Sequence, residues 1–474
     1  MRELMRKTMA EQAALIRAGE VSAAEMVDAA IGEIERLNPH VNAVVIPMYD
    51  IARDAVKELD GKEAFSGVPM LLKDVLAEYA GAPMTEGSRF LQGYISPHDS
   101  ELVARYRRAG FIICGKTNSP EFASKPTTEP ELYGATRNPW DLSRSAGGSS
   151  GGSGAAVASG MVSVAHANDG GGSTRVPAAA CGLVGLKNTR GRNPLGPDYG
   201  DVGAAGLLSE HVVTRTVLDN ALMLDVTAGG DPGAPYNPPP PLRPFAEEVG
   251  APPGRLRIAF SDQPVAPTPV HDDCKAAVRD IAKLCEELGH TVEEARPIAP
   301  TDNYNEFFST IWLGMVGWMI RDWERRTGRK PAPEHFEAHT WKMFAMDAKR
   351  RPSDFLLAVQ DMHKFARQVA PFFDDYDVWL TPTLTEPPPP LGWFDFDRAH
   401  PHQATERLEQ YPRFTSFANV TGQPAISLPL CWNDAGLPIG VQFTGRYGDE
   451  ATLLRIASQL EIARPWAQRW PQLG

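Results

Sequence analysis

A lysine and several serines stand in surroundings that are unusual for polar side chains. Two glycine- and serine-rich segments, residues 147–154 (GGSSGGSG) and 170–173 (GGGS), contain Ser149 and Ser173, and Lys73 lies within an apolar segment. A serine hydroxyl becomes a nucleophile when a base removes its proton. A partly buried lysine that is held near neutral can act as such a base. The residue types are therefore compatible with nucleophilic catalysis by serine.

Each of these features has a structural alternative. A glycine- and serine-rich segment is also typical of a flexible linker. The second segment argues against a linker, because it follows an apolar, alanine-rich stretch and stands between the charged residues Asp169 and Arg175. Lys73 can instead belong to an edge strand and extend its ammonium group into water. A Ser-His-Asp triad stays open, although no histidine lies within either segment and His166 is the nearest.

A nucleotide-binding pattern also occurs in the chain. Residues 110–117 (GFIICGKT) match the phosphate-loop pattern GxxxxGK[ST] in full. The four residues between the two glycines are Phe-Ile-Ile-Cys, which favour a buried strand over a loop that binds phosphate through its amides. We therefore reject the match and keep a non-catalytic nucleotide-binding protein only as the alternative of another class.

Composition limits the partners and the compartment. The 474 residues carry a formal net charge of -12, which argues against nucleic acid as a partner. The five cysteines are scattered without a CxxC pair, so neither a metal site nor a disulfide framework is expected, and a cytoplasmic protein with reduced thiols is predicted. The N-terminus lacks the apolar core of a secretory signal, and no apolar run approaches the ~20 residues of a membrane span. We expect a monomer or homodimer.

Segments with helical and strand patterns alternate along the chain, which predicts an α/β fold. Ser22 and Glu25 form a capping-box pattern ahead of an amphipathic helix that we expect to end at Asn38-Pro39. A second helix is predicted over residues 212–228. The segment 229–254 is rich in proline and glycine and is interpreted as a surface connection within one domain.

Two further segments are compatible with a role in substrate binding. Residues 304–319 carry aromatic and methionine side chains at helical spacing, which is typical of a core helix but also of a helix that lines an apolar pocket. The proline-rich loop 387–402 is compatible with a lid or with a segment that simply wraps the surface.

Together the motifs closely resemble those of the amidase signature family. The resemblance rests on GVPMLLKD at 67–74, GGSSGGSGAA at 147–156, DGGGSTRVPAA at 169–179, GLVGLK at 182–187 and NVTGQPA at 419–425. It implies one domain over residues 1–474, with a large twisted mixed β-sheet covered by helices on both faces. Within it we expect a helical layer (1–60), the signature core (61–200), the surface connection (229–254) and a variable substrate-pocket region (300–410).

The resemblance also implies a catalytic set and a reaction. Ser173 would be the nucleophile, Ser149 a bridging serine on a cis peptide bond, and Lys73 the base of an amide hydrolase that works through an acyl-enzyme without cofactor or metal. The amides of Gly170, Gly171 and Gly172 would form the oxyanion hole. Ser150, Asp169 and Arg175 would support these groups, although plain structural pairing remains an alternative for all three.

Bringing the pKa of a lysine from about 10.4 to 7 or 8 means disfavouring its charged form by roughly 4 kcal/mol. Burial supplies such a cost, and the neighbours Leu71, Leu72 and Val75 are apolar. The sequence around Lys73 is therefore suited to a lysine base.

The chain departs from the common family pattern at Gly170, where a β-branched residue is usual. The form NDGGGS is similar to that of nylon-oligomer cyclic-dimer hydrolases and aryl acylamidases of the family. Glycine in place of a β-branched residue should widen the strand that carries the oxyanion amides. With this resemblance, we expect a small-molecule substrate that is a bulky, aryl or linear amide, with carbamates and esters also open. The glutaminase subunit of a tRNA-dependent amidotransferase shares the motifs and is the second enzyme hypothesis.

Overall fold

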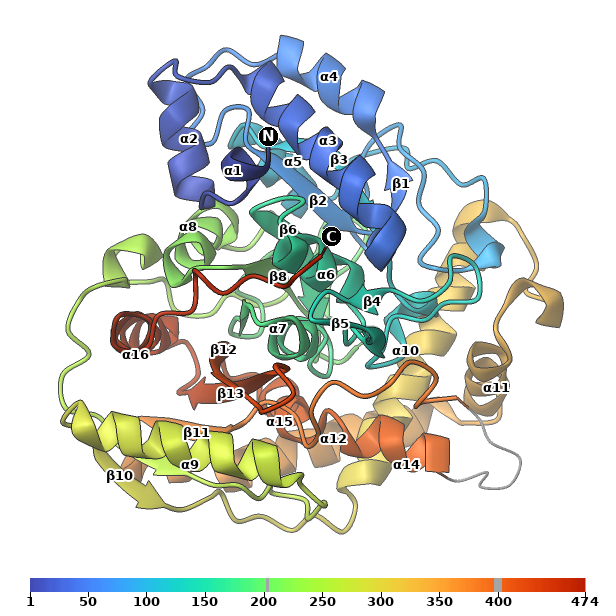
Figure 1. Cartoon of the computed structure of the whole chain (residues 1–474). Coiled ribbons are helices and arrows are strands. Elements are labelled where there is room, and N and C mark those ends of the chain that lie inside the picture. The colour runs from blue at the N-terminus through green and yellow to red at the C-terminus, as the bar shows by residue number, and fades with distance from the viewer. Residues whose placement is uncertain (202–203, 396–402, 474) are drawn as a thin grey trace.

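The computed structural model describes residues 1–201, 204–395 and 403–473. An eleven-stranded sheet runs through the centre of the molecule in the order β1-β3-β2-β6-β8-β7-β12-β13-β11-β9-β10 (Figure 1). Its strands are β1 (Val44–Pro47), β2 (Pro69–Lys73), β3 (Ile112–Thr117), β6 (Val164–Asp169), β7 (Val184–Lys187), β8 (Ser209–Thr214), β9 (Arg257–Phe260), β10 (Thr291–Glu294), β11 (Val378–Pro382), β12 (Ala425–Trp432) and β13 (Pro438–Gly445). A separate small sheet pairs β4 (Arg137–Asn138) with β5 (Asp141–Ser145).

The remaining chain is largely helical. The α-helices are α1 (Arg2–Met5), α2 (Met9–Arg17), α3 (Ala23–Val41), α4 (Tyr49–Lys57), α5 (Glu101–Arg108), α6 (Gly151–Ser159), α7 (Arg175–Cys181), α8 (Val217–Thr227), α9 (Asp272–Glu287), α10 (Tyr304–Thr327), α11 (Ala338–Asp347), α12 (Pro352–Val369), α13 (Phe372–Asp375), α14 (Gln403–Gln410), α15 (Arg413–Thr421) and α16 (Glu450–Ala463). None of these helices is both long enough and apolar enough to cross a membrane.

Helices cover both faces of the sheet because its strands are apolar on both sides. Successive side chains of a strand point to opposite faces. Thus Val164 of β6 packs in one core cluster with Tyr106 of α5, whereas the next residue, Ala165, packs in another cluster with Ala156 of α6. The predicted fold class, one α/β domain with a large mixed sheet between helical layers, is confirmed.

The sheet topology determines where chemistry can occur. Strands β2, β3 and β6 are parallel neighbours, so their carboxyl ends lie at the same edge of the sheet. These ends are Lys73, Thr117 and Asp169. In sheets of this kind the crevice beyond the carboxyl ends is the usual place for a ligand. Lys73 and the segment 170–173, which directly follows β6, are therefore brought together by the fold.

Two predicted helix boundaries are wrong. Helix α3 continues through Pro39 to Val41 and ends only at Asn42, whose φ of 53° is left-handed. Proline costs little there, because it removes a single hydrogen bond in the last turn, and the side chain of Asn38 accepts bonds from the next two backbone N–H groups after Asn42. The helix predicted from residue 212 begins at Val217, because residues 212–214 belong to the buried strand β8.

The described residues of the two proline-rich segments are mostly irregular. Residues 229–254 contain one short 3-10 helix, Phe245–Glu248, in which Phe245 is buried against the core. Of the loop 387–402, residues 387–395 are described and residues 396–402 lie outside the described residues. In the described part, the carbonyl of Pro389 accepts a hydrogen bond from the backbone of Ser145, which ties this loop to strand β5.

Candidate active site

Lys73 is the last residue of β2 and is completely buried. Its strand lies between β3 and β6 rather than at the edge of the sheet, so the alternative of a solvent-exposed edge lysine is wrong. The Nζ atom donates a hydrogen bond of 2.6 Å to the hydroxyl of Ser149 and one of 2.5 Å to the side-chain oxygen of Asn168. The amine is thus aimed at a serine of the first glycine-rich segment.

Burial lowers the pKa of Lys73 to about 7. The negative charges of Glu210, Asp169 and Glu86 act in the opposite direction and limit this shift. Because desolvation disfavours the charged ammonium, a large fraction of the amine is neutral near pH 7 and can accept a proton.

The first glycine-rich segment is a packed turn, not a linker. The peptide bond between Gly148 and Ser149 is cis, as the family resemblance implies. A Cβ atom on Gly148 would lie 2.5 Å from the backbone nitrogen of Thr127, so only glycine fits. Ser150 precedes the first residue of α6; its backbone N–H donates to the carbonyl of Ser173 at 3.3 Å and thereby joins the two segments.

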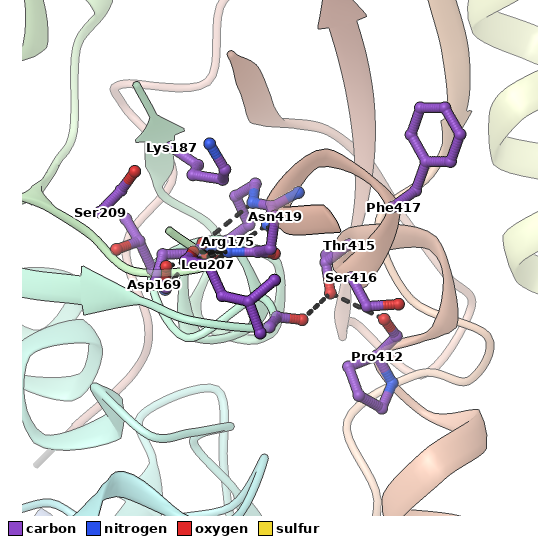
Figure 2. A network of polar contacts seen from close by, with 12 residues as sticks. Asp169, Arg175, Lys187, Leu207, Ser209, Pro412, Thr415, Ser416, Phe417 and Asn419 are labelled. Atoms are coloured by element: carbon purple, nitrogen blue, oxygen red, sulfur yellow. Dashed lines mark hydrogen bonds and ion pairs between the residues drawn. The ribbon is translucent and has the colours of Figure 1, made fainter. Parts of the chain in front are cut away.

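Ser173 stands between the end of β6 and the start of α7, and only 8% of its surface is exposed. The preceding Gly172 has a φ of 135°, and a Cβ atom there would lie 2.1 Å from Oγ1 of Thr415. The hydroxyl of Thr415 donates to the carbonyl of Gly171 at 2.7 Å (Figure 2). The loop that carries Ser173 is thus packed directly against α15.

The backbone amides near Ser173 are available to a ligand. Within the described part of the chain, none of the N–H groups of residues 170–173 donates a hydrogen bond. Amides that converge without internal partners are suited to a developing oxyanion. The amides of Gly170, Gly171 and Gly172 thus have no acceptor among the described residues, and their role as an oxyanion hole stays a prediction.

The structure brings Ser149 and Ser173 to one cavity, which both residues line. No hydrogen bond joins their two hydroxyl groups among the described residues, so the geometry supports the contact between Lys73 and Ser149 more directly than the one between the serines. Contacts of this kind commonly shorten when substrate binds.

Asp169 and Arg175 form a buried ion pair across the base of the Ser173 loop (Figure 2). Two nitrogens of Arg175 donate to the two carboxylate oxygens of Asp169, each at 2.9 Å. The same guanidinium donates to Asn419 at 2.7 Å and to Gln442 at 2.6 Å. The side chain of Asn419 in turn donates to the carboxylate of Asp169 at 2.8 Å.

This network keeps Asp169 ionised. Burial alone would raise the pKa of its carboxyl group, but Arg175 and the hydrogen bonds from Arg175 and Asn419 lower it to about 2. Asp169 also accepts from the backbone N–H of Thr174 at 3.2 Å. The pair therefore fixes the backbone on both sides of Ser173 without reaching the reacting atoms. Asn419 is the first residue of the motif NVTGQPA, on which the family resemblance rests. The spacing of the sequence could not predict that its side chain contacts Asp169.

The sequence offered no role for Asn168 and His166. Asn168 receives the hydrogen bond from Lys73 described above. The Nδ1 atom of His166 accepts a hydrogen bond of 3.2 Å from the backbone N–H of Lys73, so its Nε2 atom carries the proton toward the carboxylate of Glu210. His166 and Glu210 thus support the backbone of β2 at Lys73 rather than forming a triad with a serine.

Two cavities meet at Ser173. The smaller has a volume of about 40 Å³ and is lined mostly by apolar side chains, including Leu76, Phe122 and Met319. The larger has a volume of about 380 Å³ and reaches outward between α10, α11 and α14. Ser173 and Trp312 line both cavities, so the indole of Trp312 stands between them.

Trp312 occupies the space that glycine at position 170 was expected to leave open. A Cβ atom on Gly170 would lie 3.4 Å from the indole, which is ordinary contact. The aromatic helix α10 therefore has two roles: Phe307 is buried in the core, whereas Phe308 and Trp312 line the cavities.

Two other features do not behave as ligand sites. In the rejected phosphate-loop pattern, Lys116 is buried in β3, with its Nζ atom 3.8 Å from the carboxylate of Asp74. Among the described residues, Glu78, His98 and Asp198 lie close enough together to hold a metal ion. The guanidinium of Arg326 is ion-paired with Glu78 and lies 3.3 Å from Asp198, so a cation already occupies this group.

Comparison with known proteins shows the family to which the chain belongs. The family model described as Amidase matches residues 25–454. The chain is 39% identical over 473 residues to 6-aminohexanoate-cyclic-dimer hydrolase of Paenarthrobacter ureafaciens, covering 98% of this chain and 96% of the relative. A structure of 6-aminohexanoate cyclic dimer hydrolase complexed with substrate superimposes with a TM-score of 0.95 at 38% identity over 99% of both chains.

A bacterial aryl acylamidase of the amidase signature family has a TM-score of 0.87 and 26% identity, with 98% and 97% of the two chains covered. The chain resembles hydrolases of amide bonds over nearly its whole length, and neither the glutaminase nor the nucleotide-binding alternative is favoured. The chain belongs to the amidase family.

Proposed function

We propose that the protein hydrolyses carboxylic amides through an acyl-enzyme on Ser173, with Ser149 as the proton relay and Lys73 as the base. The observation that carries this proposal is the hydrogen bond of 2.6 Å from the buried amine of Lys73 to Ser149, which shares a cavity with Ser173. A lysine with a pKa of about 7 is matched to proton transfer near neutral pH.

The proposed reaction has two halves. Neutral Lys73 takes a proton from Ser149 while Ser149 takes one from Ser173, and the Ser173 oxygen attacks the amide carbonyl carbon. The backbone amides of Gly170, Gly171 and Gly172 donate to the resulting oxyanion. The relay then returns the proton to the departing amine as the C–N bond breaks. Water attacks the remaining ester by the same route and releases the carboxylic acid.

Ser150, Asp169 and Arg175 are proposed as positioning residues. Ser150 holds the two serine segments together through its backbone, and the ion pair of Asp169 and Arg175 holds the loop that presents the amides. None of the three is placed to exchange a proton with substrate.

For the substrate we propose a bulky or aryl amide. The relatives include hydrolases whose names specify a cyclic dimer of 6-aminohexanoate and aryl acylamides. The larger cavity beside Ser173, with a volume of about 380 Å³, is compatible with substrates of that size. Most side chains of the larger cavity come from residues 300–410, which supports this region as the variable part that selects substrate.

We also propose a cytoplasmic monomer or homodimer. The cysteines support a reducing compartment: all five are unpaired, and four are buried, where burial raises the pKa of the thiols.

A substrate panel tests the function. Purified enzyme is assayed with primary amides, anilides, carbamates, esters and glutamine, and a fluorophosphonate probe is located by peptide mass spectrometry. We expect hydrolysis of anilides or other bulky amides, and the label on Ser173. A label on another residue, or turnover of glutamine alone, would overturn the proposal.

A further inference from the structure

The two cavities that meet at Ser173 differ in how they reach solvent. The smaller one is lined mainly by buried apolar side chains of the core. The larger one ends at exposed side chains, among them Asn305, Lys342 and Glu409. In an acyl-enzyme reaction the amine must depart while the acyl group remains bound to the serine. An amine in the smaller cavity would lie behind the acyl group, so the larger cavity is the suitable place for the leaving amine.

The larger cavity is also rich in cations. Lys125, Lys342, Arg350 and Arg413 all line it, together with the imidazole of His339. Among the described residues, Glu409 is the one residue with a carboxylate that lines it. The cations come from three separate segments of the chain, so their convergence is a property of the fold rather than of one basic stretch.

Carboxylates balance this positive charge only in part: the charge of Arg413 acts on Glu409 and that of Arg350 acts on Asp347. Lys125 is paired with Glu337 at 2.8 Å. Lys342, Arg350 and Arg413 form no ion pair with a described residue; Arg350 donates to the hydroxyl of Thr310, and Arg413 donates to Asn305 at 2.5 Å.

Two observations indicate that the wall of this cavity would accept an anion. The Nε atom of Arg413 is buried without a hydrogen-bond acceptor in the described part of the chain. Burial, together with the charges of Lys125 and Lys342, lowers the pKa of His339 to about 4. Burying an unpaired cationic donor is costly, and a carboxylate bound there would satisfy it.

We propose that the larger cavity binds a carboxylate on the leaving amine, so that the preferred substrates are amides of amino acids or aminobenzoates whose acyl part is apolar and whose amine part is anionic. This proposal rests on the acyl-enzyme mechanism proposed above. It separates the two halves of the substrate by chemistry: apolar surface receives the acyl group, and Lys342, Arg350 and Arg413 receive the anion.

A matched pair of anilides tests it. N-hexanoyl-4-aminobenzoate and N-hexanoyl-4-aminobenzamide have nearly the same size and differ in the charge of the leaving amine. We expect a higher kcat/KM for the carboxylate, and we expect Lys342→Gln to reduce that preference about two- to fivefold, the range for an exposed charge pair. Raising the salt concentration should also reduce the preference for the carboxylate substrate. Lys349→Gln, an exposed lysine close by that lines no cavity, is the control and should leave the preference unchanged.

A second pair of substrates tests the direction of binding. N-phenylsuccinamate carries its carboxylate on the acyl side, and N-phenylsuccinamide is its neutral counterpart. We expect no preference for the charged member. Equal kcat/KM for the two hexanoyl anilides, or a preference for the acyl-side carboxylate, overturns the anion proposal while leaving amide hydrolysis intact.

Direct binding separates this proposal from the function on which it rests. The affinities of 4-aminobenzoate and 4-aminobenzamide are measured by calorimetry on the Ser173→Ala protein, which needs no turnover. Tighter binding of the carboxylate that weakens in Lys342→Gln supports the cationic site even where no anilide is hydrolysed. Equal affinities of the two amines contradict it.

Discussion

The amine of Lys73 and the hydroxyl of Ser149 form a hydrogen bond of 2.6 Å although the two residues are 76 positions apart and both are completely buried. This contact links the end of a central strand to the cis peptide bond that precedes α6. In the proposed mechanism a proton from the serine segments reaches Lys73 through this contact.

Ser173→Ala should reduce kcat by at least ~10³-fold, since loss of the nucleophile in serine hydrolases leaves only the catalysis of binding and the oxyanion hole. The fold should remain, because the Ser173 hydroxyl forms no hydrogen bond with a described residue. Steady-state kinetics and circular dichroism measure the two effects. Ser159→Ala, in the same helical layer but away from the cavities, is the matched control and should be fully active. Undiminished turnover in Ser173→Ala would falsify the assignment.

The activity should rise with pH through about 7, because the neutral form of Lys73 is the base and burial lowers its pKa to about 7. The pH dependence of kcat/KM reports this ionisation in the free enzyme. Lys73→Met should remove both the activity and this limb of the profile. A profile that is flat across neutral pH would show that another group accepts the proton.

Glu210→Gln should move this limb to lower pH. The charge of Glu210 is the largest influence that raises the pKa of Lys73, and glutamine can still accept the hydrogen bond from His166. Removing the charge while keeping the bond should therefore make Lys73 easier to deprotonate. The measurement is the pH profile of kcat/KM in the two proteins. A merely structural role for Glu210 would lower activity equally at every pH.

Arg175→Met should lower the free energy of unfolding by ~3–5 kcal/mol, because it leaves the carboxylate of Asp169 buried without its partner. Urea unfolding measures the loss. The comparison with the double variant Arg175→Met/Asp169→Asn provides the control: removing the unpaired charge as well should restore part of the stability.

The same pair makes the native protein sensitive to acid. The pKa of Asp169 is about 2 in the folded chain and about 4 when unfolded. Its stabilising contribution is therefore present above pH 4 and is lost as the pH falls from about 4 toward 2. Asp169→Asn should unfold with a weaker dependence on pH in that range. An unchanged dependence would mean that other carboxyl groups dominate acid unfolding.

Gly170 and Trp312 should be coupled. Gly170→Ala places a methyl group in ordinary contact with the indole and should be tolerated, whereas Gly170→Thr should displace Trp312 and reduce kcat/KM for bulky anilides. Trp312→Ala joins the two cavities and should relieve that clash. The kcat/KM of the double variant for bulky anilides is therefore expected to exceed that of Gly170→Thr alone. Additive effects of the two substitutions would contradict the packing of Gly170 against Trp312.

Local chemistry was largely predictable from the sequence. The capping box at Ser22 forms as expected, because both partners lie within one turn. The motif residues Lys73, Ser149 and Ser173 could be named because unusual residue types mark them. The helix predicted to end at Pro39 instead continues to Val41, since the cost of proline depends on its position in the last turn, which periodicity alone does not reveal.

What could not be predicted depends on contacts between distant segments. His166 and Glu210 meet through the pairing of β6 with β8, and Asn419 reaches Asp169 from 250 positions away. The orientation of Trp312 follows from how α10 packs on the loop of Gly170. Helical periodicity placed this residue on a face, but it could not distinguish core from cavity wall.

The loop that carries Ser173 is fastened by side chains made very late in synthesis. Arg175 is held by Asn419 and Gln442, which follow it by 244 and 267 positions, and Thr415 fills the space beside Gly172. A ribosome-bound chain that has not yet emerged past residue 442 lacks these contacts, so its serine stands on an unsupported loop. The loop that carries the proposed nucleophile is therefore assembled by the fold as a whole, and it lacks this support until the chain has been synthesised at least as far as Gln442.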